Sequence, residues 1–132
     1  MTTYSLMQVD AFTDQPLSGN PCAVVFDADA LDDAARLAIA KEMNLSETAF
    51  VVQSASANFG ARYFTPAEEI PMAGHPTIAT IYASIDSGRL KLNGEQTTIS
   101  LELRVGVLRV DIEANDGKVK QIVMTQNNTF AN

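Results

Sequence analysis

The chain has 132 residues, of which 46% are hydrophobic and 19% are charged, and its 9 Lys and Arg against 16 Asp and Glu give a net charge of −7. This size and composition predict one folded domain and exclude a disordered chain, and the single cysteine excludes an internal disulfide and a cysteine-based zinc site. The acidic charge argues against a nucleic-acid partner. No apolar run approaches the ~18 residues of a membrane span, and no secretory signal is visible. We therefore expect a cytoplasmic protein without a membrane partner.

The first half of the chain predicts four strands and one helix. The helix is expected over 30–43, with Asp29 as its N-cap and with Asn44 ending it in the left-handed conformation. The polar segment 13–20 is predicted to be a loop. Short apolar runs indicate strands over 4–10, 22–26, 49–53 and 59–64. The apolar face of the helix is predicted to comprise Leu31, Ala34, Ala35, Ala38 and Ile39.

The second half predicts a buried helix followed by three strands. Residues 75–86 indicate a helix that is apolar nearly all round, and such a helix is buried. Alternating residues indicate strands over 98–103 and 107–113, and the turn Asn115-Asp116-Gly117 leads into a third strand over 118–125. We therefore expect an α+β fold in which a mixed sheet wraps around the buried helix. The domain is expected to span 1–125, with a linker or frayed tail over 126–132.

Two polar segments carry residues that could act on a ligand, and each also has a purely structural interpretation. Ser18-Gly19-Asn20-Pro21 is most simply a turn before a buried strand, although Gly19 would let the backbone approach a ligand that the Asn20 amide orients. Glu47 lies between the first helix and an apolar strand. It is either a solvated loop acid, which the spacing alone favours, or a general acid/base at a partly desolvated junction.

A third segment, Phe64–Thr77, leads into the buried helix. The first amides of a helix have no partner within it and can bind a carboxylate, and Gly74 removes side-chain obstruction at that point. His75 is more often a packed imidazole than a catalyst, but a neutral imidazole at a helix N-terminus donates or accepts a hydrogen bond. Pro76 is tolerated in a first turn. Cys22, in an apolar run without a basic neighbour, is predicted to be a small buried hydrophobic residue.

Three motifs in this order resemble the PhzF-like (phenazine biosynthesis) family, which has the diaminopimelate-epimerase fold. They are Gly19-Asn20-Pro21 followed by Ala23-Val24-Val25-Phe26, then Asn44-Leu45-Ser46-Glu47-Thr48-Ala49-Phe50, and then Arg62-Tyr63-Phe64-Thr65-Pro66 with Glu69-Ile70-Pro71 and Gly74-His75-Pro76-Thr77. The resemblance implies an isomerase without cofactor or metal that moves a proton within a small carboxylated substrate. It assigns the proton shuttle to Glu47 and substrate binding to Asn20, Gly74, His75, Pro76 and Thr77.

The chain also departs from what it resembles. Related epimerases have a cysteine just before the glycine of the helix start, where this chain has Ala73, so a mechanism with two thiols is not implied. The family has a second, similar domain across the cleft, and this chain resembles the N-terminal half alone. Three interpretations stay open: an inactive fragment, a homodimer in which two copies face each other, and a non-catalytic small-molecule-binding or assembly module.

Overall fold

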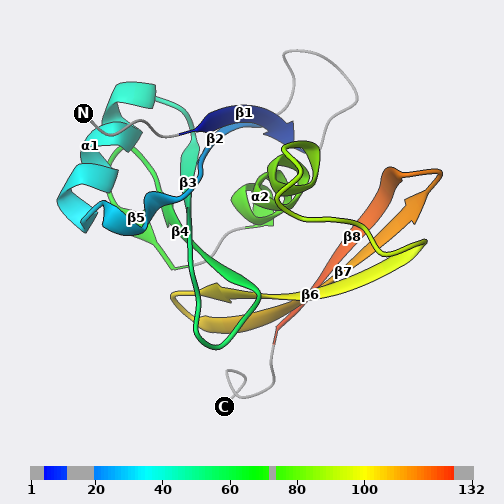
Figure 1. Ribbon diagram of the computed structural model, residues 1–132. Coiled ribbons are helices and arrows are strands. Elements are labelled where there is room, and N and C mark those ends of the chain that lie inside the picture. The colour runs from blue at the N-terminus through cyan, green and yellow to red at the C-terminus, as the bar shows by residue number, and fades with distance from the viewer. Residues whose placement is uncertain (1–4, 12–19, 72–73, 127–132) are drawn as a thin grey trace.

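The computed structural model describes residues 5–11, 20–71 and 74–126 and has an α+β fold (Figure 1). The two predicted helices and the seven predicted strands are present, and the structure adds the short elements η1 and β5. In chain order the elements are β1 (Leu6–Ala11), β2 (Asn20–Val25), η1 (Ala28–Ala30), α1 (Asp33–Met43), β3 (Glu47–Val52), β4 (Phe59–Phe64), β5 (Glu69–Ile70), α2 (Gly74–Asp86), β6 (Gln96–Leu103), β7 (Gly106–Asn115) and β8 (Lys118–Gln126).

Two of the predicted segments lie largely outside the described residues. Of the loop predicted over 13–20, the structure describes Asn20, which begins β2. Of the tail predicted over 126–132, it describes Gln126, which ends β8.

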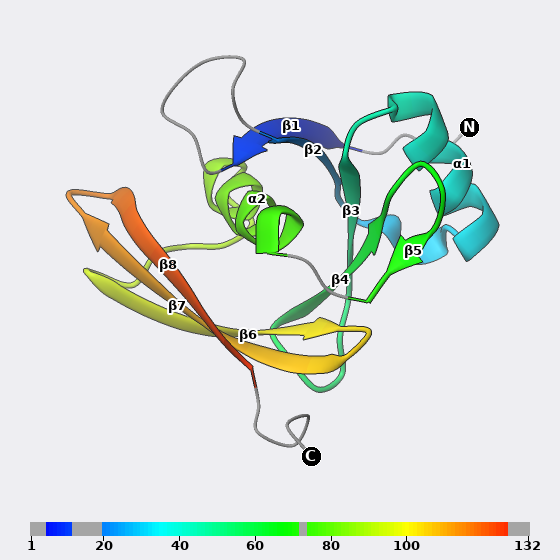
Figure 2. The ribbon, with the colours of Figure 1, turned by 180° about the vertical axis from the view of Figure 1, so that it is seen from behind.

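The strands form one mixed sheet in the order β1-β2-β3-β4-β6-β7-β8, with β5 paired to β4. The pairs β2–β3 and β4–β6 are parallel, and each parallel connection contains a helix because a chain returns parallel to its neighbour only through a long crossover. The sheet curls strongly, with α2 inside its curve and α1 against its outer face (Figures 1 and 2). The mixed, strongly curled sheet confirms the predicted α+β class.

The two faces of the sheet pack against the two helices. One core joins α2 to the inner face and includes Ile81 of α2, Ala49 of β3 and Leu101 of β6. A second core lies between α1 and the outer face, where the rings of Phe50 and Phe64 meet edge to face with their centroids 5.5 Å apart. Because successive side chains of a strand point to opposite faces, β3 contributes to both cores.

The helix α2 is buried along most of its length, as its apolar sequence predicts. Ala79, Ile81 and Ala83 are each 0% exposed. The expectation of burial on every side is wrong at Tyr82, which is 40% exposed. Tyr82 shows that part of the helix faces solvent, where a tyrosine is tolerated because its ring carries a polar hydroxyl.

The N-cap of α1 differs from the prediction. Asp32, not Asp29, is the N-cap, and its side chain accepts a hydrogen bond from the Ala35 N–H at 2.8 Å. Asp29 lies in η1, and its carboxylate accepts from the Gln53 N–H at 2.7 Å. Either aspartate has the right chemistry for a cap, and the contact with Gln53 engages Asp29 elsewhere. At the other end, Asn44 has φ 52° and ends the helix as predicted.

The predicted apolar face of α1 is also wrong in part. Ala34 and Ala38 are exposed, whereas Arg36 and Ala40 are buried. The Arg36 guanidinium donates to the Ala28 carbonyl oxygen at 3.0 Å, so that its charge has a partner while its aliphatic stem is covered. Alanines define an apolar face weakly, and the long aliphatic stem of Arg36 is buried in their place even though its Nε has no hydrogen-bond partner among the described residues.

The turn predicted at Asn115-Asp116-Gly117 is confirmed. Asp116 has φ 54° and Gly117 has φ 78°, so both lie in the left-handed region that a two-residue type I′ hairpin requires. Aspartate and glycine adopt this region more readily than most residues, and the turn therefore sets the pairing of β7 with β8.

Replacing Ile81 by alanine tests the core that joins α2 to the sheet. Because the side chain is 0% exposed, Ile81→Ala should lower the free energy of unfolding by about 2–5 kcal/mol. Val123→Ala is the matched control, since Val123 is 43% exposed and its loss should cost less than about 0.5 kcal/mol. Urea denaturation followed by circular dichroism measures both values, and equal losses would contradict the packing described.

Candidate functional site

Glu47 is the first residue of β3 and lies at the edge of the sheet where the parallel strands β2 and β3 begin. It pairs with Cys22 of β2, so the two side chains share one face of the sheet. Cys22 and Ala49 both belong to the core that contains α2. Strand alternation therefore directs Glu47 to the face that α2 occupies, where it is partly buried.

Cys22, beside Glu47, is 1% exposed, as the sequence predicts. Burial, and after it the negative charge of Glu47, raise the pKa of the Cys22 thiol from 9.0 to about 12. A thiol with this pKa stays protonated at neutral pH and is neither a nucleophile nor a base.

Tyr63 of β4 connects this part of the sheet to the first turn of α2. Its hydroxyl oxygen lies 2.7 Å from Oγ1 of Thr77, and both residues are buried. Burial is the main cause of the raised pKa of the Tyr63 phenol, and the hydrogen bond with Thr77 acts in the opposite direction. Tyr63 pairs with Ala49, which follows Glu47 by two residues on β3, so Tyr63 lies on the same face of the sheet as Glu47 and Cys22.

An ion pair and a tight turn hold the segment that enters α2. Arg62 of β4 donates to both carboxylate oxygens of Glu69 in β5, at 2.5 and 2.9 Å. These bonds raise the pKa of the Arg62 guanidinium, and Glu69 is half-buried. Oγ1 of Thr65 accepts from the N–H groups two and three residues further on, at 3.1 and 3.0 Å. The chain thus turns through a well-supported hairpin shortly before Gly74.

The remaining residues expected at the site occupy two places. Asn20 is the first residue of β2 and lies at the same edge of the sheet as Glu47. The other four are the first residues of α2: Gly74, His75, Pro76 and Thr77. Pro76 and Thr77 are buried, and Oγ1 of Thr80 donates to the Pro76 carbonyl oxygen at 2.6 Å. The side chains of Asn20 and His75, and residue Ala73, lie outside the described residues.

Reasoning from the sequence missed the supporting contacts of this site. Tyr63 has the spacing of an ordinary core residue in a strand, and its partner Thr77 lies on a different element. The one available signal was the presence of two opposite charges, Arg62 and Glu69, in two otherwise apolar strands. Opposite charges within a half-buried region favour pairing because an isolated charge there is costly.

No group of three or more His, Cys, Asp or Glu side chains that could hold a metal ion occurs in the part of the chain that the structure describes. The helices of that part are too short or too polar to cross a membrane. Several acidic side chains of the described residues form ion pairs with arginines, as Glu69 does with Arg62 and Arg104.

Comparison with known proteins identifies relatives over nearly the whole chain. The PhzC-PhzF family, described as phenazine biosynthesis-like protein, matches residues 9–131. An uncharacterized isomerase of Clostridium acetobutylicum is 39% identical over 125 residues, which make up 93% of this chain and 40% of that protein. Trans-2,3-dihydro-3-hydroxyanthranilate isomerase of Pseudomonas aeruginosa is 40% identical over 119 residues, which make up 89% of this chain and 41% of that protein.

A solved structure shows the same likeness. The crystal structure of the Bacillus anthracis phenazine biosynthesis protein of the PhzF family matches with a TM-score of 0.79 at 35% identity, over 94% of this chain and 40% of that one. These matches confirm the resemblance inferred from the three motifs and the fold that it implies. The chain spans about two fifths of the length of the curated relatives that it matches.

The raised pKa of Cys22 predicts a pH dependence of stability. The folded chain keeps the thiol proton up to a pKa of about 12, whereas the unfolded chain loses it near the ordinary value of 9.0. The folded state therefore binds more protons between these values. Its stability should fall as the pH rises through this window, by up to about 1.4 kcal/mol per pH unit.

Urea denaturation of the unmodified chain and of Cys22→Ala, at several pH values between about 8 and 11, measures this contribution. A plot of the free energy of unfolding against pH should be less steep for the variant, because the thiol no longer contributes to its slope. The contribution of Tyr63 to this slope stays in both proteins. If the free energy of unfolding changes with pH in the same way for both proteins, Cys22 is not buried beside Glu47 as described.

Proposed function

Because this chain belongs to the phenazine biosynthesis-like PhzC-PhzF family, we propose that it carries half of an isomerase site in which Glu47 moves a proton within a small carboxylated substrate. The observation that carries the proposal is the placement of Glu47 on the α2 face of the sheet, next to Cys22. Tyr63 links this position to the first turn of α2 through Thr77.

Glu47 acts first as a base and then as an acid in this proposal. The ionised carboxylate takes a proton from one carbon of the substrate, and the resulting carboxylic acid returns it to another carbon. The carboxylate is regenerated at the end of each cycle, and the substrate and product have the same atoms. Such a reaction consumes no co-reactant, which agrees with the expectation that no cofactor is needed.

The start of α2 favours a substrate with a carboxylate. The first N–H groups of a helix have no acceptor within it, and the helix dipole favours a negative charge at that end. Gly74 presents no side chain that would block the approach of an anion. The Pseudomonas aeruginosa relative is named for a hydroxylated anthranilate, which is a small carboxylate. We assign the substrate carboxylate to the amides of Gly74 and His75, beside Pro76 and Thr77, with Asn20 lining the site.

A second unit completes the cleft in this proposal. The chain spans 40% of the length of the Clostridium relative, and the resemblance to the PhzF-like family implies a second, similar domain across the cleft. A second copy of this chain, related by a two-fold axis, is one such unit. Tyr82, which is 40% exposed on α2, has an aromatic ring that a partner would cover.

A non-catalytic binding or assembly module, or an inactive fragment, is the second candidate. In this candidate the domain acts without a second one across the cleft, where a reacting substrate would stay open to water. This candidate keeps the anion site at the start of α2 but transfers no proton.

Deuterium uptake tests the role of Glu47. The 132-residue chain is incubated in deuterated water with trans-2,3-dihydro-3-hydroxyanthranilate, and NMR follows the label at carbon-bound positions. Glu47→Gln should lower the rate of uptake by about 10²–10⁴-fold, because an amide does not accept and return a proton. Glu42→Gln, at an exposed position of α1, is the matched control and should leave the rate unchanged.

The outcomes separate the two candidates. Uptake that survives in a folded Glu47→Gln variant would show that another group shuttles the proton. No uptake by the unmodified chain, together with a substrate-induced shift of the Gly74 amide resonance, would favour the binding module. Sedimentation distinguishes a homodimer from a monomer in the same samples.

A further inference from the structure

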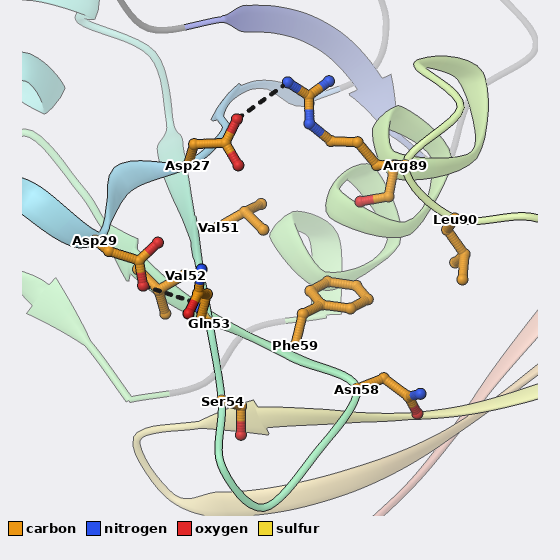
Figure 3. A pocket seen from close by; sticks show the side chains of 11 residues that line it. Asp27, Asp29, Val51, Val52, Gln53, Ser54, Asn58, Phe59, Arg89 and Leu90 are labelled. Carbon is orange, nitrogen blue, oxygen red and sulfur yellow. Dashed lines mark hydrogen bonds and ion pairs between the residues drawn. The ribbon is translucent and has the colours of Figure 1, made fainter. Parts of the chain in front are cut away.

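A pocket lies toward the end of β3 opposite Glu47, where β3, β4 and the segment after α2 meet (Figure 3). Its volume is about 440 Å³, within the range of roughly 300–1,000 Å³ that small-molecule sites occupy. Val51, which lines it, follows Glu47 by four residues of one strand, a distance of ~13 Å at ~3.3 Å per residue. The pocket is therefore separate from the candidate isomerase site and does not depend on the proposed function.

One wall of the pocket is apolar. Val51 of β3, Phe59 at the start of β4 and Leu90 after α2 line it, and all three are partly buried against the core that contains α2. Figure 3 shows the Phe59 ring between Val51 and Leu90. An aromatic or aliphatic group of a ligand would lose contact with water along this wall, which favours binding.

Three charged side chains also line the pocket, and two of them, Arg89 and Asp29, have further contacts that hold them in place. Nη2 of Arg89 lies 3.3 Å from Oδ2 of Asp27, and the Arg89 guanidinium carbon lies 4.0 Å from the centre of the Phe26 ring. Asp29 accepts a hydrogen bond from the Gln53 N–H at 2.7 Å. Arg89 and Asp29 thus occupy defined positions before a ligand arrives, whereas the side chain of Asp27 is 83% exposed.

We infer that this pocket binds an α-amino acid with an apolar side chain. The lining has two carboxylates and one guanidinium, so its net charge is negative and it repels a simple anion. A simple cation would form no favourable contact with Arg89. An α-amino acid has its ammonium and its carboxylate on the same carbon, so their partners have to be neighbours, as Asp27 and Arg89 are. The Arg89 guanidinium binds the carboxylate, Asp27 binds the ammonium, and the ligand side chain lies along Phe59.

Titration of the isotopically labelled 132-residue chain with L-phenylalanine, followed by NMR, tests the inference. The amide resonances of Gln53 and Leu90 should shift with a dissociation constant on the order of 1 mM, which the ligand efficiency of small ligands gives for about twelve non-hydrogen atoms. The compound 3-phenylpropanoate lacks the ammonium, and 2-phenylethylamine lacks the carboxylate. Each should bind at least about tenfold more weakly, because it forms only one of the two charge-assisted contacts that the amino acid forms.

Two outcomes of this titration would overturn the inference. The first is the absence of shifts at these amides at concentrations well above the expected dissociation constant. The second is equal binding of the three compounds, which would show an apolar pocket that does not recognise the two charges.

Variants of the charged pair provide an independent arm. Arg89→Gln and Asp27→Asn should each weaken L-phenylalanine about tenfold. Arg109→Gln is the control, because Arg109 pairs with Asp111 on β7, away from the pocket lining, and it should leave the affinity unchanged. If Arg89→Gln fails to fold for want of its contact with Phe26, Asp27→Asn and the three compounds still decide. Unchanged affinity in folded variants of the pair would overturn the inference.

Discussion

The packing of α2 into the curve of the sheet is the constraint on which the rest of the structure depends. Ile81 and its neighbours on α2 share one core with inward residues of β6 and β7, and the helix also contacts β1, β2 and β3. Strands from both halves of the chain therefore meet on one helix. Its first turn is thereby held at the hydroxyl of Tyr63, and the segment after its last turn reaches the pocket beside Phe59.

Burial has a chemical consequence at the edge where β2 and β3 begin. It raises the pKa of the Cys22 thiol and of the Tyr63 phenol, so both groups keep their protons at neutral pH. Neither group competes with a carboxylate as a base there. Glu47 combines a position on this face with partial exposure, and partial exposure lets a substrate reach it. The buried neighbours thus position the acid, whereas the acid itself stays accessible.

Local patterns predicted the elements well and the contacts between them poorly. The helix over α2, the strands β6 and β7 and the turn at Asp116 follow from periodicity and from the preference of single residues for special backbone conformations. The errors at α1 have another origin. Asp29 and Asp32 are equally suited to cap a helix, and the Gln53 amide of a distant hairpin engages Asp29. Arg36 is buried because the Ala28 carbonyl oxygen accepts its hydrogen bond.

The sequence by itself determined the order of the two α-helices and the seven longer strands, the motifs that place the chain in its family, and the candidacy of Glu47 as an acid between a helix and a strand. Only the tertiary structure decided that Glu47 and Cys22 share one face, that Tyr63 reaches Thr77, and that Asp27 and Arg89 line one pocket. The physical reason is register. A slip of one residue between β2 and β3 would turn Glu47 to the opposite face, and no local preference of the residues around it distinguishes the two alignments.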